Sequence, residues 1–251
     1  MQKLAWLLGA VLFAATPSLA LPALQLGPGS GSWSYDLVTG TWQTSDNPLQ
    51  LAAYANANTA NGGDGSYAWD SQANTVRYAY LVISAVPKTT LTEPPTLFDV
   101  TVMNDAGSLS LYASGNGAPP LSDPNDLSPH GIFDTYFEIY EFNFDGALGT
   151  IGNTQPGESC TGTCNGYTEL FDITINSLAT TVTGLHFDLF TVVGSGHGQL
   201  TSGPGASQVQ TNAPFTHDAE TVEVSVPEPS SLSLMALGLA GLVWTGRRRT
   251  H

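Results

Sequence analysis

Between its two ends, this sequence shows the two-residue alternation of β-strands and not the three-to-four-residue spacing of amphipathic helices. Apolar runs of strand length recur, and glycine, proline and asparagine separate them. The chain has 27 glycines and 16 prolines, a composition typical of proteins with many turns. These features predict an all-β fold.

The predicted strands span residues 32–37, 39–42, 49–54, 76–86, 98–103, 132–144, 170–175, 184–193 and 218–226. The first two read as a hairpin. About eight or nine strands without intervening helices predict a single-domain antiparallel β-sandwich of the jelly-roll type, with a closed barrel as the alternative. We expect this body to span residues 21–225.

The strongest strand signal lies in residues 132–144. Toward the C-terminal end of this strand, the aromatic residues fall at every second position and so on one face of the strand. This change along the strand predicts a bend or bulge midway. Glu138 and Glu141 differ in parity, so they cannot face each other as an acid–base pair. Three apolar residues of the 184–193 strand share one face: Leu185, Phe187 and Leu189.

The charge of the body is strongly negative. Two of the chain's six basic residues and 20 of its 21 acidic residues lie there, which gives the body a net charge of −18. Such a surface repels phosphate backbones and anionic lipid, so nucleic-acid binding is disfavoured. It attracts divalent or other cationic partners and maintains solubility.

The N-terminus resembles an export signal. Lys3 precedes an apolar run at residues 4–15, a proline follows, and Ser18 and Ala20 stand three and one before a potential cut. We therefore predict that residues 1–20 are a signal peptide, removed after Ala20 by signal peptidase. A buried N-terminal helix is the alternative.

The C-terminus contains a second apolar run, at residues 232–244. As a helix it would measure about 20 Å, short of a hydrocarbon core of about 30 Å. Residues 230–246 could span a locally thinned bilayer. Three arginines follow, which the positive-inside rule keeps cytoplasmic as a basic stop: Arg247, Arg248 and Arg249.

Two prolines precede this run and keep the chain extended there. The motif Pro227, Glu228 and Pro229, the apolar helix and the terminal arginines together resemble a PEP-CTERM sorting signal over residues 226–251. The resemblance implies recognition of the motif by an exosortase of Gram-negative bacteria that make extracellular polysaccharide. It also implies transient anchoring in the inner membrane and delivery of the body to the outer surface or matrix. A simple C-terminal anchor is the alternative.

The body itself resembles the choice-anchor N family. The likeness rests on the blocks at residues 128–137, 184–188 and 213–220. Members of that family carry alternative C-terminal sorting signals on a common body. The resemblance implies no activity and no catalytic residues.

The two cysteines, Cys160 and Cys164, flank Thr161, Gly162 and Thr163. In an exported protein such a close pair predicts a local structural disulfide. A redox pair is less favoured because the spacing is not Cys-x-x-Cys, and a zinc site would need further ligands.

Four histidines lie in the body: His130, His186, His197 and His217. His130 with Asp134, or His217 with Asp218 and Glu220, could supply metal ligands if their loops meet. Nothing in the spacing requires this, and structural roles at strand starts are the favoured interpretation.

Calcium is the metal that the loops suggest. Residues 61–65 and 123–126 offer oxygen ligands, although neither segment matches a known calcium loop. Because neither loop matches, we expect no cofactor; if a metal is bound, calcium is the candidate. Trp33, Trp42 and Trp69 could stack on sugars, and packing in the core explains them equally well.

Catalytic residues are not evident. The segment Gly194–Gly198 approximates Gly-x-Ser-x-Gly but lacks the strand-to-helix context of a nucleophile elbow. We expect a non-enzymatic surface or extracellular-matrix protein sorted by an exosortase. The alternatives are a carbohydrate- or calcium-binding module of the exopolysaccharide and, less favoured, a glycan-active enzyme.

Overall fold

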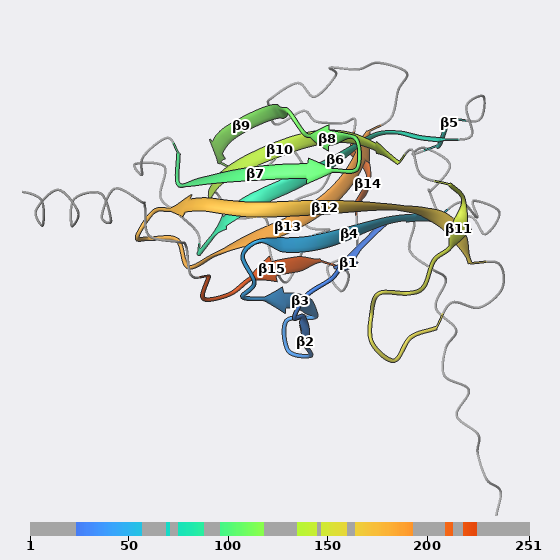
Figure 1. Ribbon diagram of the computed structural model, residues 1–251, viewed down its shortest axis with the longest axis horizontal. Helices are drawn as coiled ribbons and strands as arrows, with labels where there is room; N and C mark the ends of the chain where they lie inside the picture. Colours follow the sequence, from blue (N-terminus) through green and yellow to red (C-terminus); the bar gives the residue numbers. More distant parts are fainter. Residues whose placement is uncertain are drawn as a thin grey trace, which may run out of the picture.

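The computed structural model describes residues 24–56, 69–70, 75–87, 96–117, 135–144, 147–159, 164–192, 209–212 and 218–224. Every regular element in these ranges is a β-strand, which confirms the all-β class (Figure 1). Within the same ranges, no helix is long and apolar enough to cross a membrane. The predicted signal peptide and C-terminal helix lie outside them.

The first sheet contains six of the described strands. Their spatial order is β1 (Leu24–Pro28), β4 (Leu49–Asn56), β12 (Asn165–Leu178), β7 (Phe98–Asn104) and β8 (Gly107–Ser108), with β11 (Gly149–Thr150) also paired to β12. All pairings are antiparallel. Burial alternates along most of β12, so one face of this sheet packs inward and the other faces solvent.

The second sheet contains nine of the described strands. Their order is β2 (Ser34–Asp36), β3 (Thr41–Thr44), β15 (Ala219–Thr221), β13 (Gly184–Val192), β6 (Thr75–Val86), β10 (Thr135–Phe144) and β9 (Leu111–Gly117), with β14 (Val209–Asn212) paired to β13 and β5 (Trp69–Asp70) paired to β6. The pair β15–β3 is parallel. The other pairs are antiparallel.

The long strands alternate between the two sheets along the chain: β4, β7 and β12 lie in the first, and β6, β10 and β13 lie in the second. Side chains from both sheets form one hydrophobic cluster. Phe142 of β10 packs edge-on against Phe171 of β12 with ring centroids 4.7 Å apart. Phe98 of β7 contacts Tyr136 of β10 in the same way at 5.0 Å. The two sheets therefore face each other across a shared core.

The outer face of the second sheet, which points away from the other sheet, is also buried near its middle. Tyr80 and Val82 of β6, Ile139 of β10 and Phe190 of β13 form a second apolar cluster there. Tyr80 and Phe190 stack with ring centroids 5.1 Å apart. Burial on both faces explains why the sequence of β6 is almost continuously apolar.

Several local predictions are confirmed. The hairpin exists as the antiparallel pair β2–β3. Leu185, Phe187 and Leu189 share the core face of β13. The register of β10 shifts at residues 139–140 against β9 and at 142–144 against β6, which confirms the expected bulge.

The predicted number of strands is wrong, because the described residues alone contain 15. The missed strands include β9, whose sequence is largely polar or small because it pairs at the edge of the sheet. The predicted strand at residues 218–226 is also too long, since β15 ends at Thr221. Glu223 adopts a φ of +50°, which turns the chain out of the extended conformation.

Candidate functional site

A row of polar side chains crosses the outer face of the second sheet. The strand register places Ser84 of β6 beside His186 of β13, His186 beside Glu220 of β15, and Glu220 beside Gln43 of β3. The alternation of β13 explains His186, because its neighbours Leu185 and Phe187 occupy the core face. Four strands form this row, and two of them, β13 and β15, bring titratable side chains from distant parts of the sequence to one place.

Two aspartates lie next to this row. Asp188 is two residues beyond His186 and therefore shares its face. Asp218 stands directly before β15, and its carbonyl oxygen accepts a hydrogen bond from the Trp42 amide at 3.1 Å. Continuing the antiparallel register of β13 and β15 places Asp188 and Asp218 opposite each other.

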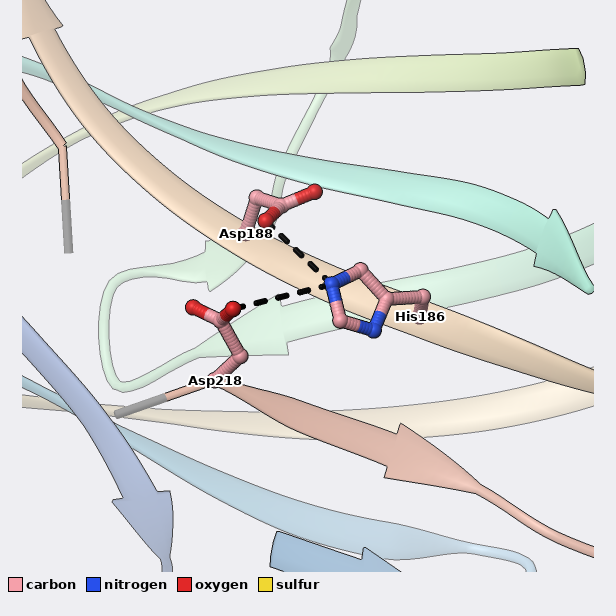
Figure 2. A group of neighbouring side chains, drawn as sticks. All are labelled: His186, Asp188 and Asp218. Atoms are coloured by element: carbon pink, nitrogen blue, oxygen red, sulfur yellow. Dashed lines mark ion pairs between the residues drawn. The ribbon is translucent and has the colours of Figure 1, made fainter. Parts of the chain in front are cut away.

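His186 connects these carboxylates (Figure 2). Its Nε2 atom lies 3.3 Å from Asp188 Oδ1 and 3.8 Å from Asp218 Oδ2. Its Nδ1 atom lies 3.9 Å from Glu220 Oε2. One ligand atom from each of His186, Asp188 and Asp218 falls within 4.8 Å of the others. We call these three residues the His186 cluster.

Asp218 is the most buried member of the cluster. Its side chain is 1% exposed, against 14% for His186 and 11% for Asp188. Neither carboxylate oxygen of Asp218 has a hydrogen-bond partner among the described residues. Leaving a buried polar group without a partner costs about 1–3 kcal/mol, and more when the group is charged.

Burial and charge act in opposite directions on His186. Burial lowers the pKa of its imidazole, but the charges and hydrogen bonds of Asp188, Glu220 and Asp218 outweigh burial and hold that pKa well above its usual value. Burial is the main reason why the pKa of Asp218 is also raised well above its usual value. The charge of Asp188 adds to that rise, and His186 opposes it. Ionisation of Asp218 is therefore unfavourable unless a further positive charge lies beside it.

Glu220 is fixed from the other side. Gln43 Nε2 donates a hydrogen bond to Glu220 Oε1 at 2.8 Å. The other carboxylate oxygen faces His186 Nδ1. This arrangement sets the direction of the imidazole ring, so that Nε2 points toward the two aspartates.

A second buried acidic group lies on the core face of the same sheet. Tyr136 donates a hydrogen bond to Glu138 Oε1 at 2.9 Å, and Tyr140 donates one to Oε2 at 2.7 Å. Burial, with the hydrogen bond and charge of Glu138, raises the pKa of Tyr136 to about 12 and raises that of Tyr140 as well. Glu141, in contrast, accepts a hydrogen bond from Tyr80 on the outer face. The predicted separation of Glu138 from Glu141 is confirmed.

Many of the predicted site residues lie outside the described residues. These are His130, Asp134, His197, His217, the two candidate calcium loops, Cys160 and the whole sorting segment. Cys164 is disulfide-bonded, and its predicted pairing with Cys160 stays a prediction. Trp33 and Trp42 pack against the core, and Trp42 Nε1 donates a hydrogen bond to the Thr154 carbonyl at 3.0 Å.

Sequence reasoning grouped Asp218 and Glu220 with His217, their neighbour in the chain. The structure instead places them against His186 and Asp188. The sequence did hold part of this information. His186 and Asp188 are two residues apart in one predicted strand, and Asp218 and Glu220 are two apart in another, so the members of each pair must share a face. The pairing of β13 with β15 could not be read from either strand.

Comparison with known proteins identifies the C-terminus. Residues 225–249 match the PEP-CTERM protein-sorting motif. The chain therefore carries this motif, which implies processing by an exosortase, export and localisation at the cell surface. The matched range contains Pro227, Glu228, Pro229 and the three arginines.

The body is not assigned by these comparisons. No curated protein matches the sequence. Among solved structures, the chain is similar to the one described as "AvmM Catalyzes Macrocyclization in Alchivemycin A Biosynthesis", with 9% identity and a TM-score of 0.34, over 82% of this chain and 90% of that chain. A likeness this weak indicates neither fold nor function. The resemblance of the body to the choice-anchor N family stays a prediction.

Proposed function

We propose that this chain is a non-enzymatic surface protein of Gram-negative bacteria that an exosortase delivers to the exopolysaccharide matrix. The observation that carries the proposal is the sorting motif at residues 225–249. In this proposal residues 1–20 are a signal peptide, residues 21–225 are the delivered body, and residues 226–251 are removed.

The charges of the tail explain how it would act. The signal peptide starts export, and the three terminal arginines resist transfer through lipid, so the apolar run pauses in the inner membrane. The proline-flanked Glu228 then stands outside the membrane in an extended segment that cannot join the helix. That segment is the substrate of the exosortase.

The structure of the body is consistent with a role as a stable delivered module. Its strands alternate between two facing sheets, which supports a jelly-roll-like sandwich. Glu138, a buried acid of its core, has both carboxylate oxygens occupied by tyrosine hydroxyls. Because both oxygens of Glu138 are occupied in this way, the residue supports a structural role and a non-enzymatic core.

Two variants in the native host test the proposal. The first lacks residues 226–251, and the second carries Pro227→Ala, Glu228→Ala and Pro229→Ala while it keeps the apolar run and the arginines. We expect the deletion variant in the periplasm or medium and the alanine variant in the inner membrane, unprocessed. Wild-type protein should reach the surface without its arginine-bearing peptide.

Cell fractionation and mass spectrometry of the C-terminus measure these outcomes. Surface levels of the deletion variant equal to those of the wild type would contradict the proposal. So would recovery of the intact arginine terminus from the surface form.

A further inference from the structure

We propose that the His186 cluster binds one divalent transition-metal ion of the zinc class, held by His186 Nε2 and one carboxylate oxygen each from Asp188 and Asp218. This site is independent of the sorting signal and adds a ligand-binding property to the body. Figure 2 shows the three side chains converging from β13 and from the residue before β15.

The spacing of the donor atoms fits a shared ion. Two ligands about 2.1 Å from a tetrahedral zinc ion lie about 3.4 Å from each other. Nε2 of His186 lies 3.3 Å from Asp188 Oδ1 and 3.8 Å from Asp218 Oδ2. The three donor atoms lie within 4.8 Å of one another, and rotation of the two carboxylate groups would bring their oxygens to the spacing of a shared ion.

The missing partner of Asp218 is an independent observation that points to a cation. Within the part of the chain that the structure describes, its buried carboxylate has no hydrogen-bond donor on either oxygen. It also lies opposite Asp188 in the strand register, and facing like charges destabilise a sheet. A cation between them would satisfy both groups at once.

Protonation of His186 does not supply the hydrogen-bond donor that Asp218 lacks. Nε2 carries at most one hydrogen, and it lies closer to Asp188 than to Asp218. The distance of 3.8 Å to Asp218 exceeds that of a hydrogen bond. A metal ion can accept lone pairs from all three groups.

The surroundings of His186 resemble those of a metal ligand. Metal-binding histidines usually donate their other ring N–H to a carboxylate or carbonyl oxygen, which sets the tautomer and the ring orientation. Here the carboxylate of Glu220 faces Nδ1 at 3.9 Å, an ion-pair distance and not that of a hydrogen bond, and Gln43 fixes Glu220. Glu220 and Gln43 are therefore positioning residues.

The donor set selects the class of metal. One imidazole nitrogen and two carboxylate oxygens suit zinc and its neighbours, whereas calcium prefers six to eight oxygens. Three protein ligands leave one coordination position for water. His186 and Asp188 retain 14% and 11% exposure, which gives the ion a route from solvent, and the negative body attracts cations.

Isothermal titration calorimetry on the full chain, stripped of metal with EDTA and dialysed, tests the proposal. We expect one zinc ion per chain in a high-affinity phase and at least tenfold weaker binding of calcium. Zinc should also raise the melting temperature, since an ion that binds the native state selectively stabilises it.

Asp218→Asn keeps the shape of the side chain and should weaken the high-affinity phase by about 100-fold or more. The matched control is Asp172→Asn, which alters an exposed carboxylate on the first sheet that accepts a hydrogen bond from Gln50. This variant should bind zinc as the wild type does. If Asp218→Asn does not fold, Asp188→Asn replaces it, with the same expectation.

Substitution with Co²⁺ gives an independent readout. Visible absorption of the wild-type complex should be intense, as a four-coordinate site requires, and Asp218→Asn or Asp188→Asn should abolish it. The proposal is overturned if the wild type shows no zinc phase at millimolar ion. It is equally overturned if that phase persists in the aspartate variants or if calcium binds as tightly as zinc.

Discussion

The second sheet carries one buried acidic cluster on each of its two faces, and the two clusters differ in how their charges are satisfied. On the core face, Glu138 receives one hydrogen bond on each oxygen, from Tyr136 and Tyr140. On the outer face, Asp218 is also buried and receives no hydrogen bond from the described residues. The same sheet thus allows a comparison between a buried carboxylate whose hydrogen bonds are satisfied and one whose hydrogen bonds are not.

The difference teaches what each cluster is for. A buried network whose members all have partners stabilises one arrangement and leaves no place for a ligand. A buried carboxylate without a donor costs free energy that a folded protein tolerates when a ligand supplies the missing partner. We therefore assign a structural role to Glu138 and a binding role to Asp218.

The largest effect is expected at the core face. Glu138→Ala leaves two buried tyrosine hydroxyls without their acceptor, so the free energy of unfolding should fall by about 3 kcal/mol. Urea unfolding followed by tryptophan fluorescence measures it. Glu138→Gln, which keeps one acceptor oxygen, is the matched control and should lose less. A loss below about 1 kcal/mol for Glu138→Ala would show that the tyrosines do not depend on it.

A smaller effect of opposite sign is expected at the outer face. In EDTA, Asp218→Asn removes a buried carboxyl group that lies beside the charge of Asp188 and has no hydrogen-bond partner among the described residues, so it should raise the free energy of unfolding by about 1 kcal/mol. Asp172→Asn should change it by less than about 0.5 kcal/mol, as exposed positions usually do. Destabilisation by Asp218→Asn under these conditions would mean that His186 already neutralises Asp218, and the contrast between the two faces would disappear.

The third effect, similar in size to the second, concerns the tyrosines at high pH. An unfolded tyrosine ionises near its ordinary pKa of 10, whereas folded Tyr136 keeps its proton until about pH 12. The unfolded state therefore loses its proton first, and the stability due to this group, complete below pH 10, is lost between pH 10 and 12.

Tyr136→Phe should cost about 1 kcal/mol at pH 7 and flatten the fall in stability between pH 10 and 12. Urea midpoints measured across that interval check this expectation. An unchanged slope in Tyr136→Phe would contradict the assigned role of Glu138 in holding the phenol protonated.

These two clusters also show how far the sequence could predict the structure. The alternation of residues 184–193 correctly places Leu185, Phe187 and Leu189 in the core, because a half-buried strand must separate apolar from polar residues. The same alternation places His186 and Asp188 together on the other face. Strand β9 was missed because pairing at an edge depends on backbone groups and leaves little apolar pattern in the sequence.

The binding site needed information that no local pattern contains. His186 and Asp218 are brought together by the pairing of β13 with β15, which joins segments about 30 residues apart in the chain. Neighbours in sequence suggested His217 as the partner of Asp218. The absence of a hydrogen-bond donor for Asp218 could be recognised only once the packing around it was known.

The central claim is that a metal ion completes the outer cluster, and anomalous X-ray diffraction tests it most directly. Crystals grown with zinc should be measured at wavelengths on both sides of the zinc absorption edge. We predict one anomalous peak about 2.1 Å from His186 Nε2 and from one oxygen each of Asp188 and Asp218. A structure in which no such peak is present and His186 closes directly onto the two carboxylates would contradict the claim.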